Sequence, residues 1–157
     1  KKRIGYLAYI KEGAKSLFDK TNLNEIVYEI DGVEYRGLFS FIIVSSANRI
    51  AGINNFYKDV KLDDNKFEVL LCNISKKKDI LRSLYFLTLY DVEKVPGLYL
   101  YKTDNLKIKF IDKPKKPWCI DGEMLEPFVD KYDIRIDRSL KMMIPDRNVD
   151  KLFVNKE

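Results

Sequence analysis

Hydrophobic and polar positions alternate along much of this chain with the two-residue period of β-strands. The clearest example is residues 25–30, in which every second side chain is apolar, followed by Asp31 and Gly32. An Asp-Gly pair between alternating segments is typical of a tight hairpin turn. We therefore expect a hairpin here, with its return strand at residues 33–35.

Other apolar segments predict more strands. Residues 37–45 form a near-continuous apolar run, as expected for a strand that is buried on both faces. In residues 106–111 the apolar side chains alternate with Lys107 and Lys109, so the lysines should face outward. The remaining predicted strands are residues 67–72, 98–102, 118–120, 133–137 and 140–144.

Two segments have the spacing of amphipathic helices, residues 5–20 and residues 76–92. Residues 46–65 are polar and irregular, which is long for a loop in a compact domain and typical of functional loops. The pattern predicts a mainly β fold (α+β by strict count), an antiparallel β-sandwich with two helices. We expect residues 1–157 to form a single domain.

The two cysteines and the absence of histidine exclude several chemistries. Cys72 and Cys119 lie in apolar surroundings without the spacing of a zinc site, so we expect two buried thiols. A Ser-His or Cys-His nucleophile is excluded because the chain has 0 His. Most of the ten Tyr, including Tyr85, Tyr99 and Tyr101, stand at positions typical of core packing.

The net charge of +5 is unevenly distributed. Residues 1–20 and residues 102–116 each hold six basic and two acidic side chains. Such stretches fit an anionic partner such as phospholipid headgroups or nucleic acid, although on charge alone an ordinary solvated lysine face is the more common explanation. Because the aromatic side chain of Phe110 alternates with the lysines, it should point into the core, which argues against nucleic-acid binding.

An acidic turn precedes the strand at residues 67–72. Asp63, Asp64 and Asn65 have good turn chemistry, since Asn tolerates the left-handed conformation and Asp accepts bonds from its own backbone. A carboxylate on such a turn, with carbonyls beside it, also offers the oxygen ligands that Mg²⁺ prefers. Residue types alone leave both interpretations open.

A second acidic turn is formed by Asp121, Gly122 and Glu123. Asp-Gly again indicates a tight hairpin. The alternative is that Glu123 serves as a general base, which requires only a carboxylate within hydrogen-bonding reach of a substrate hydroxyl.

The order of these features resembles a known family. The segments that carry the resemblance are Arg3-Ile4-Gly5-Tyr6-Leu7-Ala8-Tyr9, the Asp31-Gly32 hairpin, Ser45-Ser46-Ala47-Asn48, Asp63-Asp64-Asn65, Asp121-Gly122-Glu123 and the closing strand at residues 139–145. In this order they are similar to the C-terminal domain of bacterial diacylglycerol kinases, within the diacylglycerol kinase and sphingosine kinase superfamily. Relatives tend to have Asp-Gly where this chain has Asp64-Asn65.

The resemblance implies a fold, a reaction and site residues. The fold is the β-sandwich part of a two-domain lipid kinase, as in diacylglycerol and NAD kinases. The reaction transfers the γ-phosphate of ATP to a lipid hydroxyl, converting diacylglycerol into phosphatidic acid. Glu123 corresponds to the proton acceptor, and Asp64 to a Mg²⁺ ligand. Lys61 and Lys66 would offer only backbone carbonyls there, because a protonated lysine side chain cannot ligate Mg²⁺.

The family's Gly-Gly-Asp-Gly nucleotide loop does not occur in these residues. We therefore expect the α/β nucleotide-binding domain to be absent from this chain, which alone would be inactive. The implied partners are a lipid substrate, an anionic membrane surface and that N-terminal domain, in a cytoplasmic protein at the inner face of the membrane; a homodimer stays open. The alternatives are a non-catalytic β-sandwich that binds membranes or proteins, and a kinase for a sphingoid base, a polyprenol or NAD.

Overall fold

The computed structural model describes residues 22–47, 57, 60–89, 94–115, 118–137, 139, 141, 143 and 153. Nine strands and one helix lie within this part of the chain. They are β1 (Asn24–Ile30), β2 (Val33–Phe39), β3 (Phe41–Ser45), β4 (Phe67–Cys72), α2 (Lys77–Leu89), β5 (Leu98–Thr103), β6 (Asn105–Phe110), β7 (Cys119–Ile120), β8 (Glu123–Met124) and β9 (Lys131–Arg135).

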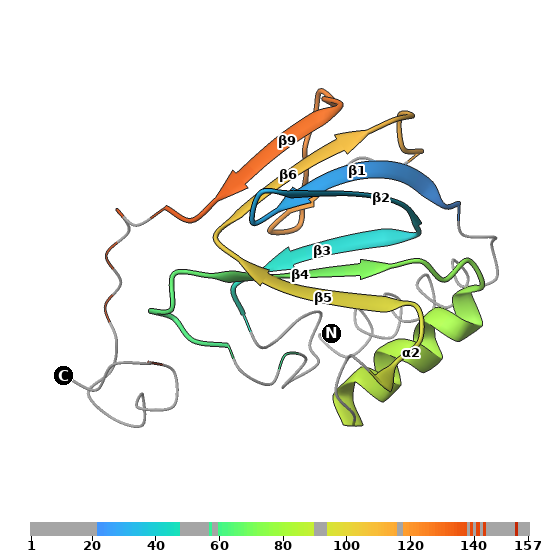
Figure 1. Cartoon of the computed structure of the whole chain (residues 1–157), viewed down its shortest axis with the longest axis horizontal. Helices are drawn as coiled ribbons and strands as arrows, with labels where there is room; N and C mark the ends of the chain where they lie inside the picture. Colours follow the sequence, from blue (N-terminus) through green and yellow to red (C-terminus); the bar gives the residue numbers. More distant parts are fainter. Residues whose placement is uncertain are drawn as a thin grey trace, which may run out of the picture.

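The strands form two larger sheets and a small hairpin. One sheet has the order β2-β1-β6-β9, the other has the order β3-β4-β5, and β7 pairs with β8. Every pairing is antiparallel. The two larger sheets are stacked, as Figure 1 shows, and the predicted antiparallel sandwich is confirmed.

The main hydrophobic core lies between these sheets. It combines side chains from β1, β2 and β6 of one sheet with side chains from β4 of the other. Fully burying one such side chain contributes about 1.5–3 kcal/mol relative to leaving it exposed. The buried members are Ile26, Tyr28, Ile30, Phe39, Phe67, Val69, Leu71, Leu106, Ile108 and Phe110.

The β1–β2 hairpin agrees with its prediction. Asp31 and Gly32 connect the strands with φ angles of 52° and 78°. Positive φ at both central residues is the backbone that matches the twist of a two-residue hairpin. The return strand is longer than expected, because β2 continues to Phe39.

The single strand predicted at residues 37–45 is wrong. The apolar run is divided at Ser40, so β2 ends in one sheet and β3 begins in the other. Ser40 donates both its N–H and its hydroxyl to the carbonyl of Cys72, at 2.7 and 3.0 Å. These bonds hold a corner at which the chain crosses between the sheets, and β3 is only half-buried.

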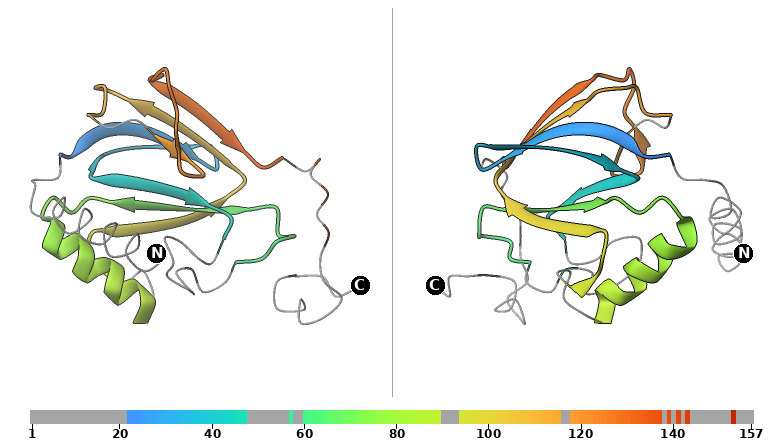
Figure 2. Two further views of the ribbon diagram at one scale, coloured as in Figure 1. Left: turned by 180° about the vertical axis from the view of Figure 1, so that it is seen from behind. Right: turned by 45° about the vertical axis from the view of Figure 1, so that its right-hand side comes forward.

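The strand that is buried on both faces is β4, in which all 6 residues are buried. Val69 and Leu71 point into the main core, whereas Leu70 and Cys72 contact a second core with Ile80 of α2. Helix α2 therefore covers the outer face of the three-stranded sheet (Figure 2). β4 thus has a protein layer on each side.

The β7–β8 hairpin is also confirmed, with Asp121 and Gly122 at φ 50° and 95°. Cys72 is buried as expected, but Cys119 is exposed, so its predicted burial is wrong. Both residues of the short strand β7 are exposed, because this hairpin adds no strand to either large sheet.

Other predictions have mixed outcomes. The predicted helix at residues 5–20 lies outside the described residues, and of the predicted strand at 140–144 only 141 and 143 are described, neither in a strand. Tyr101 packs against the core as expected, whereas Tyr85 and Tyr99 are exposed. Within the described ranges, no helix has the length and apolar character needed to cross a membrane.

Candidate functional site

The acidic turn that precedes β4 has the local geometry that its residue types predict. Asn65 adopts the left-handed conformation, with φ 55°. The backbone N–H of Lys66 donates to Oδ1 of Asp64 at 3.1 Å, which closes the turn through the aspartate side chain. The turn interpretation is therefore confirmed. It directs the Asp64 carboxylate toward the neighbouring strand β5.

One lysine on β5 forms ion pairs with two carboxylates from different elements. The Nζ atom of Lys102 lies 2.7 Å from Oδ2 of Asp64 and 3.8 Å from Oε1 of Glu68. Glu68 on β4 is directly opposite Lys102 in the sheet register. The side chain of Glu68 is only 4% exposed and that of Asp64 14%, so little water screens these charges.

Glu68 was not predicted as a site residue. Its signal in the sequence is one charged residue inside the otherwise apolar strand Phe67–Cys72. A buried carboxylate needs a charged or hydrogen-bonding partner, and that requirement could have identified it. The identity of the partner, Lys102, depends on strand pairing that residue types alone do not specify.

Tyr57 extends this cluster on the helix side of the three-stranded sheet. The tyrosine is buried, and burial together with the negative charge of Glu68 raises the pKa of its hydroxyl well above the usual range. The hydroxyl therefore stays protonated at neutral pH and can donate a hydrogen bond. Burial similarly raises the pKa of the Cys72 thiol.

The Mg²⁺ ligands expected from the resemblance were Asp64, Lys61 and Lys66. The turn supplies one carboxylate, which Mg²⁺ can accept because it usually retains several waters. Both oxygens of Asp64 already have a partner, the Lys66 N–H and the Lys102 ammonium. No group of three or more His, Cys, Asp or Glu suited to a metal occurs among the residues with described placement. The metal site stays a prediction.

Glu123, the expected general base, lies on β8 opposite Ile120, directly after the hairpin turn. Its side chain is exposed and open to a substrate. Within the described segments no hydrogen bond or ion pair joins it to Asp64 or to the other charged residues. The base role stays a prediction, because the structure tests the hairpin and not the chemistry.

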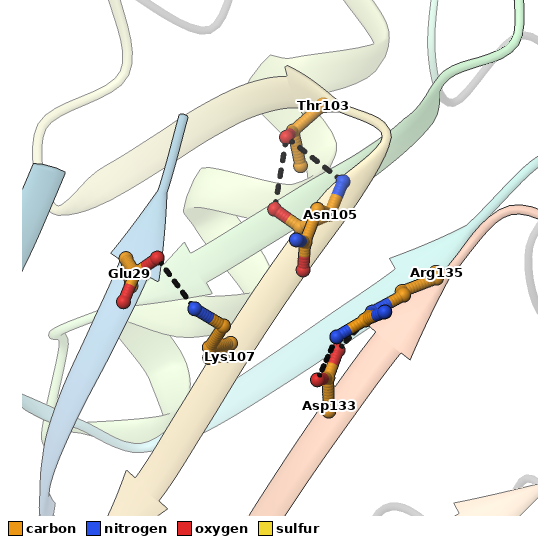
Figure 3. A network of polar contacts seen from close by, with 6 residues as sticks. All are labelled: Glu29, Thr103, Asn105, Lys107, Asp133 and Arg135. Atoms are coloured by element: carbon orange, nitrogen blue, oxygen red, sulfur yellow. Dashed lines mark hydrogen bonds and ion pairs between the residues drawn. The ribbon is translucent and has the colours of Figure 1, made fainter. Parts of the chain in front are cut away.

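Polar contacts near the start of β6 connect the two sheets. Thr103, which is fully buried at the end of β5, donates its hydroxyl to Asp31 Oδ1 (2.9 Å) or to the Asn105 carbonyl (3.0 Å), and accepts the Asn105 N–H. Figure 3 shows the Thr103–Asn105 contacts above Lys107. This arrangement holds the chain where it passes from β5 into β6.

The outward face of β6 is less basic than the sequence indicates. Lys107 pairs with Glu29 at 2.8 Å, as Figure 3 shows. On β9, Arg135 binds both oxygens of Asp133, and these hydrogen bonds lower the pKa of that carboxyl. Lys102 and Lys107, two of the six basic residues in the 102–116 stretch, are therefore paired with carboxylates.

Comparison with solved structures identifies the fold. The crystal structure of a putative diacylglycerol kinase from Bacillus anthracis str. Sterne matches 68% of this chain, with a TM-score of 0.52 and 16% sequence identity. This chain shares its fold with part of that protein. It spans 35% of that protein's length, about a third. A second structure of a putative diacylglycerol kinase from the same organism gives a TM-score of 0.48 at 17% identity, over 63% of this chain and 33% of that one.

The resemblance to diacylglycerol kinases is thereby confirmed for the fold. No protein-family model and no curated protein matches the sequence. At 16% identity the match concerns the β-rich architecture and not individual side chains. The shared fold accounts for the stacked sheets, whereas the roles expected for Asp64 and Glu123 rest on the order of motifs in the sequence and stay predictions.

Proposed function

We propose that this chain is the C-terminal β-sandwich domain of a lipid kinase that transfers the γ-phosphate of ATP to a lipid hydroxyl. Diacylglycerol is the expected substrate and phosphatidic acid the product. The observation that carries the proposal is the shared fold with part of a putative diacylglycerol kinase. The two acidic turns, at Asp64 and at Asp121, follow each other in the expected order along the chain, and each is a tight turn in the structure, which supports the proposal.

In this proposal Glu123 acts as the general base. The lipid hydroxyl oxygen attacks the γ-phosphorus, the bond from that phosphorus to the bridging oxygen of ADP breaks, and Glu123 takes the hydroxyl proton. The exposed position of Glu123 on β8 leaves room for a substrate from outside the sandwich. A separate α/β domain would supply most contacts to ATP, so this chain alone should not catalyse the phosphoryl transfer.

Mg²⁺ is the cofactor expected at the Asp64 turn, with backbone carbonyls of Lys61 and Lys66 completing the protein ligands. A divalent cation there would compete with the ammonium of Lys102, which lies 2.7 Å from the same carboxylate. Like charges this close repel strongly when partly buried. Metal binding would therefore require Lys102 to move toward Glu68 or into solvent.

The proposal is tested with the complete gene product, γ-labelled ATP, Mg²⁺ and a panel of acceptors. The panel contains diacylglycerol, a sphingoid base and a polyprenol in mixed micelles, and NAD in solution. We expect Mg²⁺-dependent label in phosphatidic acid, and no label with the 157-residue chain by itself. Label in another lipid or in NAD would support kinase activity with a substrate other than diacylglycerol. No label in any acceptor would refute the proposed kinase activity.

A further inference from the structure

The β7–β8 hairpin, which carries Glu123, belongs to neither of the large sheets. Its strands have two residues each, and the side chains of both strands are exposed. Among the described strands, β7 and β8 pair only with each other. An isolated two-stranded hairpin is marginally stable in water. Contacts outside the hairpin ladder must therefore fix where the Glu123 carboxylate lies.

The contacts that attach the hairpin are aromatic, and they lie at both of its ends. Trp118, directly before β7, packs against Phe110 of β6 and Tyr132 of β9, with ring centroids 5.9 and 5.3 Å apart. Phe128, which follows β8, packs against the same Phe110 ring at 5.9 Å. Phe110 is 7% exposed and belongs to the main core. The two flanking rings therefore join the hairpin to the four-stranded sheet.

Trp118 is the ring whose placement is coupled most directly to Glu123. The N–H of Leu125 donates to the Trp118 carbonyl at 2.9 Å, so the ladder continues one pair beyond the two strands. Glu123 lies directly opposite Ile120, which is two residues after Trp118. Because side chains alternate along a strand and paired residues share a face, Trp118, Ile120 and Glu123 stand on one face of the hairpin. The direction in which the indole packs therefore sets the direction in which the carboxylate projects.

The ring of Trp118, rather than its polar group, makes these contacts. Its Nε1 atom is buried and has no hydrogen-bond partner within the part of the chain that the structure describes. A buried donor without an acceptor is unfavourable, so the ring contacts must offset that cost. A phenylalanine at this position would keep an aromatic ring and lose only a donor that nothing accepts.

We propose that Trp118 is a positioning residue for phosphoryl transfer, because its packing holds the Glu123 carboxylate where an acceptor hydroxyl can reach it. The inference rests on the proposed role of Glu123 as the general base. A base must lie within hydrogen-bonding distance of the proton that it takes, and a displacement of about 1 Å can lower a rate about 10²-fold. The alternative is a purely structural role, in which the loss of Trp118 lowers stability and leaves the kcat of the folded protein unchanged.

The test measures kcat of the complete gene product with γ-labelled ATP, Mg²⁺ and diacylglycerol in mixed micelles, below the unfolding temperature of each variant. We expect Trp118→Ala to lower kcat about 10–10²-fold without a change in KM for ATP. Trp118→Phe should stay within about threefold of the wild type, because it keeps a ring in the cluster. The matched control is Tyr101→Ala, which removes another half-buried ring packed against the main core. Tyr101 contacts Tyr28 and Tyr35, far in sequence from the hairpin, so its loss should leave kcat within about twofold.

Two further measurements separate positioning from stability. The double variant Trp118→Ala with Glu123→Gln should have a kcat within about twofold of Glu123→Gln alone, because displacing the base costs nothing once the base has been removed. Amide hydrogen exchange, followed by mass spectrometry, should become faster at residues 119–125 in Trp118→Ala. We expect no such change in Trp118→Phe or in Tyr101→Ala.

The outcomes distinguish this inference from the proposed function. A wild-type kcat for Trp118→Ala, beside a lowered kcat for Glu123→Gln, would overturn the inference and leave the proposed base in place. A Glu123→Gln protein that keeps the wild-type kcat would refute the proposed base and the inference with it. Losses that multiply in the double variant, or hairpin exchange that Trp118→Ala does not change, would leave Trp118 with a structural role alone and overturn the inference.

Discussion

Lys102 is the residue whose contacts connect the two acidic elements of the site. Its Nζ atom lies 2.7 Å from Oδ2 of Asp64 on the turn and 3.8 Å from Oε1 of Glu68 on β4. Removing one partner from such a cluster leaves charges of the same sign close together with little solvent. The residue is 35% exposed, so water reduces but does not abolish the interaction.

We expect Lys102→Met to lower the free energy of unfolding in urea by about 1–3 kcal/mol without added metal. In the proposed metal site the ammonium and a divalent cation would compete for Asp64, so Mg²⁺ should stabilise this variant more than it stabilises the wild type. The control is Lys107→Met, which breaks the exposed pair with Glu29 and should cost less than about 1 kcal/mol with no response to Mg²⁺. A Lys102→Met protein whose stability Mg²⁺ does not change would remove Asp64 from the proposed metal ligands.

Elements set by a local pattern were predictable from the sequence, and elements set by distant partners were not. The β1–β2 and β7–β8 hairpins follow from Asp-Gly pairs, and the inward and outward sides of β6 follow from alternation. The corner at Ser40 depends on the carbonyl of Cys72, which is distant in sequence. Similarly, the pattern identified α2 but could not show that Tyr85 faces outward, because the covered face depends on the sheet that it meets.

The turn before β5 offers a test of how tightly neighbouring elements pack around Gly97. Gly97 has φ +82°, and an added Cβ would lie 2.5 Å from Cγ1 of Ile74 and 2.8 Å from Oδ1 of Asn73. Gly32, with φ +78°, has no atom within 4 Å of such a Cβ. We expect Gly32→Ala to cost about 1–2 kcal/mol from backbone strain alone, and Gly97→Ala to cost a further 1–3 kcal/mol, roughly, from the clash. Equal midpoints and slopes in urea for the two variants would contradict the packing described around Gly97.

For the whole molecule, the sequence was sufficient to predict the β-sandwich fold, but it was insufficient to define the proposed catalytic centre. Alternating strands and short turns restrict a chain of this length to few layered architectures, and stacked antiparallel sheets are one of them. The kinase centre that we propose would also need residues of a second domain, and this chain spans about a third of the matching structure.

The most direct test of the central claim compares two glutamates in the complete gene product. Glu123 and Glu126 are both exposed and three residues apart, so Glu126→Gln is a matched control for Glu123→Gln. We predict that Glu123→Gln lowers kcat for lipid phosphorylation about 10²–10⁴-fold without a change in KM for ATP, whereas Glu126→Gln stays within about twofold of the wild type. Equal kcat values for Glu123→Gln and the wild type would show that this domain does not supply the proton acceptor.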